Sequence, residues 1–236
     1  MAARVAVVVF PGSNCEHDVV KAIGIVGTHL APGSTGEPVP VEAALVWHSE
    51  RSLSGYDAVV LPGGFAHGDY LRPGAIARFS PVMGAVAKFA GDGGPVLGIC
   101  NGFQVLTEAG LLPGALQKNA GLKFLCRTVD VRVDSTSSVL TSGAAAGQVL
   151  RLPINHFEGN YTCDQRTLDE LRAEGRVVLR YVDNPNGATD DIAGISSTRG
   201  NVVGLMPHPE RASDELLGST DGLVLLRSFL GVAERV

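Results

Sequence analysis

Short apolar runs recur along the first half of the chain. They are rich in valine and span residues 4–10, 41–47, 58–61 and 95–99. Runs of this length, bounded by turn residues, are typical of strands that are buried on both faces of a parallel sheet. Between them, apolar residues recur at helical spacing over residues 16–26 and 75–90. The alternation predicts an α/β fold, in which a mostly parallel central sheet carries helices on both faces.

The pattern changes after residues 112–114. Residues 124–134 alternate valine with charged residues, as expected of antiparallel strands with one solvated face. A stretch rich in glycine, proline and serine at residues 27–40 is interpreted as a surface excursion. We find no internal repeat and no linker, so we expect a single domain over residues 1–236. The same patterns predict further strands at 148–154, 177–182 and 202–206, and helices at 167–174 and 223–232.

The composition narrows the classes of partner. The chain has 236 residues and a formal net charge of -5, with acidic and basic residues interspersed. Because there is no basic face and no polybasic segment, we expect neither nucleic acid nor a membrane as a partner. No apolar run approaches the length that spans a bilayer, and the run at residues 5–10 is too short for a signal peptide. We therefore expect a cytoplasmic protein.

The four cysteines are too scattered to suggest a disulfide framework or a zinc site. The chain contains no C-x-x-C pair and no histidine pair at ligand spacing, so we expect no bound metal. We interpret Cys15, Cys126 and Cys163 as packing residues, because no base is recognisable near them in the sequence. Cys100 remains as the one candidate for a reactive thiol.

Cys100 stands where an apolar run meets a helical pattern, with Gly98 and Gly102 on either side. This G-x-nucleophile-x-G spacing is typical of a strained strand-to-helix turn that exposes a nucleophile. The N-terminus of the following helix would favour the thiolate and could hold an oxyanion. An inert buried cysteine in a close-packed glycine turn explains the motif equally well. A catalytic base elsewhere in the chain is needed to distinguish the two interpretations.

A histidine and a glutamate together provide such a base. His208 and Glu210 are separated by Pro209 and follow a predicted buried strand. In the extended chain that proline favours, positions two apart point the same way, so Glu210 can orient His208. Because both this strand and the Cys100 strand end at the same edge of a parallel sheet, we expect a Cys-His-Glu triad.

The loop at Gly63 and Gly64 follows another predicted strand. A backbone N–H from such a loop, together with the N–H of the residue after the nucleophile, forms the usual oxyanion hole of nucleophile-elbow enzymes. The second donor would be Asn101.

The sequence resembles the class I, triad-type glutamine amidotransferases, and more narrowly the glutaminase subunits of phosphoribosylformylglycinamidine synthase. The similarity covers nearly the whole chain. The continuation Asn101-Gly-Phe-Gln104 and the opening motif are the segments that point to the subfamily. The segments that carry the resemblance are residues 9–15, 62–65, 68–72, 98–104, 111–116, 184–187, 192–195 and 204–211.

The resemblance implies a flavodoxin-like fold and a set of roles. Cys100 would be the nucleophile, His208 the acid and base, and Glu210 its orienter. The resemblance further implies that the oxyanion and the substrate are bound by Gly63, Gly64, Asn101, Gln104, His156 and Glu158. Glutamine would be cleaved to glutamate and ammonia through a thioester.

The resemblance also implies partners. The chain has no G-x-x-x-x-G-K-[ST] motif and no G-x-G-x-x-G after a strand, so nothing in it recognisably binds ATP. The related enzymes pair this subunit with an ATP- and Mg-dependent synthetase subunit, which uses the ammonia to make formylglycinamidine ribonucleotide in purine biosynthesis. A small third subunit often completes the assembly.

Two segments depart from the family pattern. Phe157 stands where the related proteins usually have glycine, in Asn155-His-Phe-Glu-Gly159, and Ala66-His67 replaces a more usual Ser-Tyr pair. These changes bear on the shape of the glutamine pocket and on loops that face the partner.

Other functions stay open at this stage. One is another class I glutaminase or a cysteine hydrolase, although related peptidases have histidine directly after the cysteine and related esterases place the acid before the histidine. The other is a non-catalytic docking or regulatory subunit, whose expected signature is a lost nucleophile or base.

Overall fold

A nine-stranded sheet runs through the protein, in the order β2-β1-β3-β4-β11-β10-β9-β6-β7. The computed structural model describes residues 2–28 and 40–233. Strands β2, β1, β3, β4 and β11 pair in parallel, and this order is that of flavodoxin-like folds. The bounds of these strands are β1 Ala3–Val9, β2 Val41–Trp47, β3 Ala58–Leu61, β4 Val96–Ile99 and β11 Val202–Leu205.

The other side of the sheet is antiparallel. Strand β10 (Ile192–Ser196) pairs with β11 and with β9 (Val177–Tyr181), and β6 (Leu125–Val133) pairs with β9 and with β7 (Val149–His156). A separate pair joins β5 (Ala115–Gln117) to β8 (Asn160–Thr162). The expected mostly parallel sheet with antiparallel strands in the second half is therefore confirmed.

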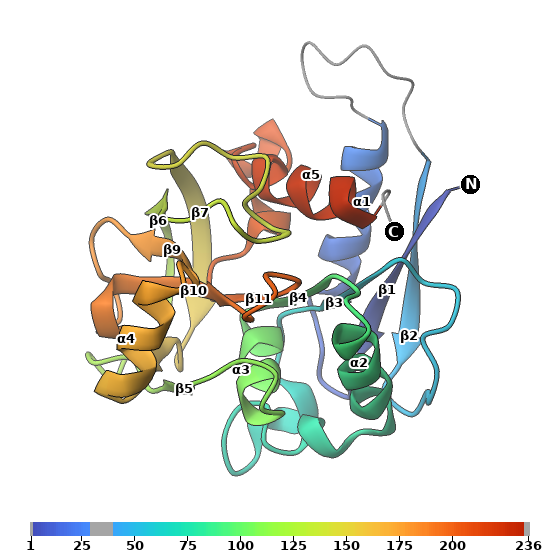
Figure 1. Ribbon diagram of the computed structural model, residues 1–236, viewed down its shortest axis with the longest axis horizontal. Helices are drawn as coiled ribbons and strands as arrows, with labels where there is room; N and C mark the ends of the chain where they lie inside the picture. The colour runs from blue at the N-terminus through green and yellow to red at the C-terminus, as the bar shows by residue number, and fades with distance from the viewer. Residues whose placement is uncertain (1, 29–39, 234–236) are drawn as a thin grey trace.

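Helices cover both faces of the sheet (Figure 1). Helices α1 (Glu16–Thr28) and α5 (Gly222–Ala233) lie together on one face, and α2 (Pro81–Gly91) and α3 (Asn101–Glu108) lie on the other. Helix α4 (Gln165–Ala173) lies beside the antiparallel strands. None of the helices in the described ranges combines the length and the hydropathy that a bilayer crossing requires. Single turns of 3-10 helix occur at Ala66–Asp69, Ala77–Phe79, Thr189–Asp191, Pro209–Arg211 and Glu215–Leu217.

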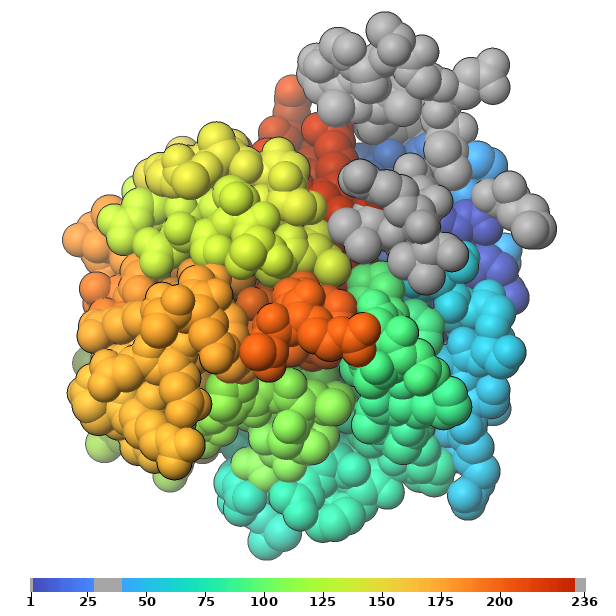
Figure 2. Space-filling view, in the orientation of Figure 1, coloured from blue at the N-terminus to red at the C-terminus, as the bar shows by residue number. Residues whose placement is uncertain are grey.

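The strands that carry the candidate residues are buried along their whole length. Every residue of β3, β4 and β11 is buried, which explains why their sequences are continuous apolar runs rather than alternating ones. The turn before β11 is tied to the end of α2, since Nδ2 of Asn201 donates to the carbonyl oxygens of Ala90 and Gly94 at 2.9 and 3.0 Å. In Figure 2 this turn is the dark orange segment near the centre of the view, and it contacts the green segment of α2 to its right.

Most of the predicted elements are present, with ends that shift by two residues or fewer. The continuous helix expected over 75–90 is wrong. A turn of 3-10 helix ends at Phe79, and α2 begins at Pro81. Ser80 is extended (φ -62°, ψ 140°), because a residue that precedes proline is pushed out of the helical region.

Three short strands were missed altogether. β5 and β8 have three residues each, and β10 has five. β5 and β8 are too short for a hydrophobic period to be recognised, and the sequence of β10, Ile-Ala-Gly-Ile-Ser, is interrupted by Gly194. Pairing with residues distant in the chain defines all three. The predicted excursion at 27–40 lies, apart from its ends, outside the described residues.

Candidate active site

Cys100 lies in a sharp turn between β4 and α3, as the spacing of its glycines predicts. Its backbone has φ 50° and ψ -104°, a sparsely populated conformation that costs about 1–3 kcal/mol. The glycines are required by space, since a Cβ on Gly102 would lie 2.0 Å from the carbonyl oxygen of Leu61, and one on Gly98 would lie 2.7 Å from that of Gly102. The turn holds the thiol at the N-terminus of α3, where its Sγ lies 3.8 Å from the carbonyl oxygen of Asn155.

His208 and Glu210 emerge at the same edge of the sheet, because β11 is the parallel neighbour of β4. Nδ1 of His208 and Oε1 of Glu210 are 2.6 Å apart, and the two residues are 1% and 2% exposed. Burial alone would lower the pKa of His208, but the Glu210 carboxylate and the nearby sulfurs of Cys100 and Cys15 raise this pKa well above its usual value. The imidazole is therefore charged at neutral pH and held in one orientation.

A second cysteine borders the same histidine, which the sequence analysis missed. Sγ of Cys15 lies within 4.8 Å of the ligand atoms of His208 and Glu210, and it accepts a hydrogen bond from Nη2 of Arg211 at 3.1 Å. Cys15 is buried, so it does pack as expected, but it also contacts a site residue. The packing role expected of Cys126 is wrong, because this residue is exposed on β6. One signal was available in the sequence: Cys15, like Cys100, stands between a buried strand and a helix.

Cys15, His208 and Glu210 also form a group of three possible metal ligands in the described part of the chain. The 2.6 Å contact with Glu210 occupies Nδ1 of His208, so an ion would have to take the Cys15 sulfur and Nε2, which has no hydrogen-bond partner. A structural zinc site normally has four protein ligands. The arrangement fits an oriented histidine better than a metal centre.

Only Cys100 of these two cysteines lines a cavity, which has a volume of about 190 Å³. This cavity lies at the carboxyl ends of the parallel strands, where α/β proteins bind ligands. Cys15 is not part of the lining. The cavity is lined by Gly64, Phe65, Asp69, Pro73, Cys100, Gln104, Asn155, His156, Phe157 and Glu158.

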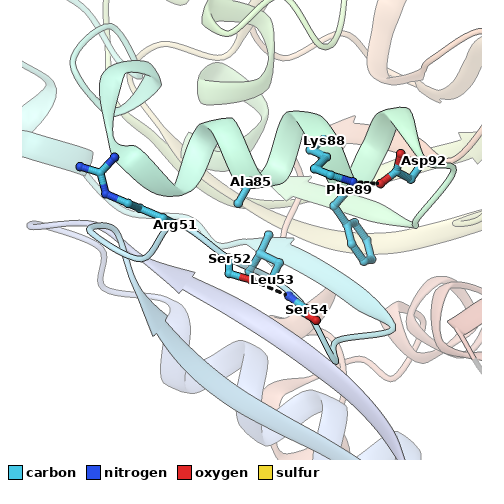
Figure 3. A pocket seen from close by; sticks show the side chains of 8 residues that line it. All are labelled: Arg51, Ser52, Leu53, Ser54, Ala85, Lys88, Phe89 and Asp92. Atoms are coloured by element: carbon cyan, nitrogen blue, oxygen red, sulfur yellow. Dashed lines mark hydrogen bonds and ion pairs between the residues drawn. The ribbon is translucent and has the colours of Figure 1, made fainter.

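A larger cavity, of about 360 Å³, lies away from these residues (Figure 3). It is formed by α2 and the loop that precedes β3. Its charged residues include Lys88 and Asp92, which pair with each other at 2.6 Å. Because its lining contains neither a nucleophile nor a base, volume alone does not identify the site.

Gly63 is required by close packing around His208, and Gly64 by close packing against the backbone of the loop that follows β1. A Cβ on Gly63 would lie 2.8 Å from Cε1 of His208 and 3.1 Å from Sγ of Cys15. The carbonyl oxygen of Gly63 accepts a hydrogen bond from the N–H of Cys15 at 3.3 Å. Because the peptide is trans, the N–H of Gly64 points the opposite way, and Gly64 lines the cavity beside Cys100. This geometry suits an oxyanion donor.

Asn101 and Gln104 connect the start of α3 to two loops. The side chain of Asn101 accepts from the N–H of Ala66 at 2.9 Å and donates to Oδ1 of Asp69 at 3.1 Å and to Oε1 of Gln104 at 2.9 Å. Nε2 of Gln104 in turn donates to the carbonyl oxygen of Glu158 at 2.5 Å. The backbone N–H of Asn101, in the first turn of α3, has no partner within the helix, so it is available as the second oxyanion donor.

His156 lies at the end of β7 and borders the same cavity. Its Nδ1 donates to Oδ1 of Asn119 at 3.1 Å, because Nδ2 of Asn119 already donates to the carbonyl oxygens of Lys123 and His156. Burial, reinforced by the nearby His208, lowers the pKa of His156 to about 4. The ring is therefore neutral at pH 7, and its Nε2 is a bare acceptor without a partner.

Comparison with known proteins agrees with this geometry. A sequence profile of the CobB/CobQ-like glutamine amidotransferase domain matches residues 2–221. The chain belongs to this family of glutamine amidotransferases. It is 58% identical over 231 residues to the phosphoribosylformylglycinamidine synthase subunit PurQ of Rubrobacter xylanophilus, covering 98% of this chain and 99% of that protein. The resemblance predicted from the motifs is therefore confirmed.

Two further relatives support the same assignment. The PurQ subunit of Koribacter versatilis is 51% identical over 237 residues, with 97% of both chains covered. The structure of PurLQS from Thermotoga maritima contains a chain that is 41% identical and superimposes with a TM-score of 0.86, covering 98% of this chain and 99% of that one. The whole fold of this amidotransferase, including its antiparallel side, is thus shared with a solved relative.

Both departures from the family pattern lie near the cavity of this amidotransferase. Phe157 lines the cavity and is 36% exposed, and its carbonyl oxygen accepts from the N–H of Asn119 at 2.9 Å. His67 has a positive φ of 55° and packs against His48 with ring centroids 5.3 Å apart. The phenylalanine therefore forms part of the cavity wall, whereas His67 lies outside the lining and packs against His48.

Proposed function

We propose that this glutamine amidotransferase hydrolyses glutamine to glutamate and ammonia, with Cys100 as nucleophile, His208 as acid and base, and Glu210 as orienter. One observation supports this proposal above the others. A strained cysteine turn opens into a cavity next to a buried histidine that is charged and oriented by a carboxylate. A protonated imidazole beside a thiol favours the thiolate, which is the reactive form.

The proposed reaction begins when the Cys100 thiolate attacks the carbonyl carbon of the side-chain amide. The negative charge that develops on the oxygen would be held by the backbone N–H groups of Gly64 and Asn101, while Gly63 leaves room for His208. The His208 imidazolium then gives its proton to the departing nitrogen, which leaves as ammonia. Water, deprotonated by the now neutral His208, hydrolyses the thioester and releases glutamate.

The other predicted residues have supporting roles in this proposal. Gln104 and Asn101 brace the cavity wall through their mutual hydrogen bond of 2.9 Å. Glu158 lines the cavity and accepts a hydrogen bond from Gln104 through its backbone carbonyl, and His156 offers a neutral acceptor. We propose that these four residues shape the binding site for glutamine.

We further propose that the ammonia passes to a separate synthetase subunit, as the names of the PurQ relatives and of PurLQS suggest. That partner would bind ATP and Mg²⁺ and make formylglycinamidine ribonucleotide in the cytoplasm, with a small third subunit completing the assembly. On this proposal the isolated chain is a poor or unregulated glutaminase that its partner stimulates.

Affinity labelling and product release test the proposed function. A glutamine-like electrophile should label the wild-type thiol and should not label the Cys100→Ala variant, and glutamate release should rise when the co-purifying synthetase is added. Labelling that ignores the Cys100 substitution would reject the glutaminase mechanism. Full ligase activity of the purified chain alone would reject the requirement for a partner.

A further inference from the structure

The loop between β1 and α1 (residues 10–15) carries the opening motif of the sequence and has no role in the reaction proposed above. It packs along the loop that offers the Gly64 N–H. The carbonyl oxygen of Gly63 accepts hydrogen bonds from the N–H groups of Asn14 and Cys15 at 3.5 and 3.3 Å. Because the peptide is trans, these bonds hold the N–H of Gly64 on the opposite side, towards the cavity that Gly64 lines.

Further backbone contacts join the same two loops. The N–H of Phe65 donates to the carbonyl oxygen of Gly12 at 3.0 Å, and Ser13 forms an isolated antiparallel bridge with Gly64. A Cβ on Gly64 would lie 2.8 Å from the backbone nitrogen of Asn14 and from Cα of Ser13. The loops are therefore in direct contact, and the position of the β1–α1 loop sets the position of the oxyanion donor.

Arg211 joins this β1–α1 loop to the turn that carries His208 and Glu210. Its Nη2 donates to Sγ of Cys15 at 3.1 Å, and its Nε donates to Oδ2 of Asp18, in the first turn of α1, at 3.2 Å. Its own backbone N–H donates to the carbonyl oxygen of His208 at 3.2 Å. A planar guanidinium fork can hold two acceptors in fixed positions, which the single ammonium of a lysine cannot do.

The side chain of Arg211 does not contact the substrate cavity. It is not among the residues that line the cavity beside Cys100, and it is 30% exposed. Burial by itself would lower the pKa of Arg211, but Cys15, Glu210 and Asp18 raise this pKa above its usual value. The guanidinium is therefore charged at neutral pH, and any effect of it on the reaction passes through the residues that it holds.

We propose that Arg211 is a positioning residue for the reaction, whose fork holds the β1–α1 loop against the His208 turn and so fixes the separation between the oxyanion donor and the base. This assignment rests on the glutaminase function proposed above. Because the oxyanion exists only in the transition state, a displaced donor lowers kcat and leaves KM nearly unchanged. A role in stability alone would change the folded fraction but not the kcat of the folded protein.

Glutamine hydrolysis by the full-length chain together with its synthetase tests the assignment. Arg211→Gln removes both the fork and the charge, and Arg211→Lys keeps only the charge. We expect Arg211→Gln to lower kcat roughly 10- to 100-fold, as for a displacement on the order of 1 Å, with KM within about twofold. Arg211→Lys should lower kcat roughly 3- to 10-fold, because an ammonium holds one of the two acceptors.

The two acceptors of the fork can also be removed one at a time. Asp18→Ala should lower kcat by less than roughly tenfold, because Nη2 of Arg211 keeps Cys15. Combining Asp18→Ala with Cys15→Ala should lower kcat as much as Arg211→Gln does, since neither acceptor of the fork then remains. A double variant that loses no more activity than its single variants would overturn the assignment.

Arg172→Gln is the matched control. Nε and Nη2 of Arg172 also form a fork with a carboxylate of another element, that of Asp190, and neither residue lines the cavity. Loss of this fork should leave kcat and KM unchanged. An equal loss of kcat in Arg172→Gln and Arg211→Gln would show a general effect of losing an arginine and would overturn the assignment.

Hydrogen exchange gives a measurement that does not depend on turnover. The N–H groups of Asn14 and Cys15 should exchange faster in Arg211→Gln than in the wild type, whereas those of β9 should exchange as before. Unchanged exchange, wild-type kcat in Arg211→Gln or Arg211→Lys, or a loss confined to KM or to thermal stability would overturn the assignment. Faster exchange in a protein whose wild type releases no glutamate would reject the glutaminase function and leave the loop-holding role of Arg211 intact.

Discussion

Two strand-to-helix turns, β1 to α1 and β4 to α3, each place a cysteine beside His208. Cys15 and Cys100 both follow a buried parallel strand and precede a helix, and both sulfurs act on the same imidazole. They differ in their surroundings. Cys100 is strained, with φ 50°, and faces the cavity, whereas Cys15 is covered and is hydrogen-bonded to Arg211 and Asn14 at 3.1 Å each.

The difference shows that proximity to a base does not by itself make a nucleophile. Both cysteines are buried, lie at a helix N-terminus and neighbour His208, so none of these three features separates them. Access to a ligand-sized cavity and a backbone held in a strained conformation are found only at Cys100 among these two. We infer that the glycine pair around Cys100 matters because it aims the sulfur outward.

Removing the Cys100 sulfur should have the largest effect on activity. Cys100→Ala should lower kcat for glutamine hydrolysis by at least roughly 1,000-fold, because no other group in the cavity can form the thioester. Glutamate release by the complex with the synthetase would measure it. A variant that keeps even a tenth of the activity would move the chemistry to another residue, with Cys15 the first candidate.

Removing the Glu210 carboxylate, which contacts the histidine that both cysteines share, should have the second largest effect on activity. Glu210→Gln should lower kcat by roughly 100- to 10,000-fold, because the neutral amide neither holds the charged imidazole nor orients it. The pH dependence of kcat/KM gives a second measurement. Since Glu210 raises the pKa of His208, the alkaline decline of the wild type should move to lower pH in the variant.

The same shift has a consequence for stability. A histidine whose pKa is raised on folding stabilises the protein fully below its unfolded value of about 6.5 and loses that contribution as the pH rises through the folded value. Glu210→Gln should therefore reduce this alkaline loss. A pH profile that is unchanged in both activity and stability would show that Glu210 does not control His208.

A methyl group between the two turns should have an intermediate effect. Gly63→Ala would place a Cβ 2.8 Å from Cε1 of His208 and 3.1 Å from Sγ of Cys15, so the histidine must move. A displacement on the order of 1 Å costs roughly 100-fold in rate. Activity together with thermal stability would distinguish a displaced base from an unfolded protein.

Gly84→Ala serves as the control for Gly63→Ala. Gly84 lies in α2, and a Cβ there would meet nothing within 4 Å. Alanine in a helix should stabilise the protein by about 0.5–1 kcal/mol, and the activity should not change. If Gly63→Ala were as active as Gly84→Ala, the close approach of His208 would have no role in catalysis.

Removing the covered sulfur should have the smallest effect. Cys15→Ala leaves the cavity intact and deprives Arg211 of one acceptor, while Arg211 keeps Asp18 at 3.2 Å. We expect a loss in kcat/KM of less than roughly tenfold, as for a packing change near the base, and unchanged labelling of Cys100. Complete loss of labelling in Cys15→Ala would show that the two turns share the chemistry.

Much of the fold could be predicted because its central strands are continuous apolar runs. β3 was placed residue for residue, because its four residues Ala-Val-Val-Leu are all apolar and all buried. The bounds of the edge strand β2 were also predicted correctly, although Glu42 interrupts its apolar run. The helix break at Ser80 was missed because alanine-rich periodicity outweighed the effect of Pro81. β5 and β8 were missed because strands of three residues acquire their identity only from their partners, and β10 was missed because Gly194 interrupts its apolar run.

The sequence by itself determined the nucleophile turn, because glycine spacing acts locally, and it named His208, Glu210 and the family. The extended backbone expected around Pro209 is wrong, since Pro209–Arg211 forms a turn of 3-10 helix that His208 precedes, so the contact between His208 and Glu210 comes from this turn. Only the tertiary structure decided that Cys15 reaches the same histidine, that Asp69 and Glu158 share one cavity, and that Nε2 of His156 is left unpaired there. These relations join residues from separate strands and loops. No local pattern encodes them, because the distance between their side chains depends on how the sheet orders its strands.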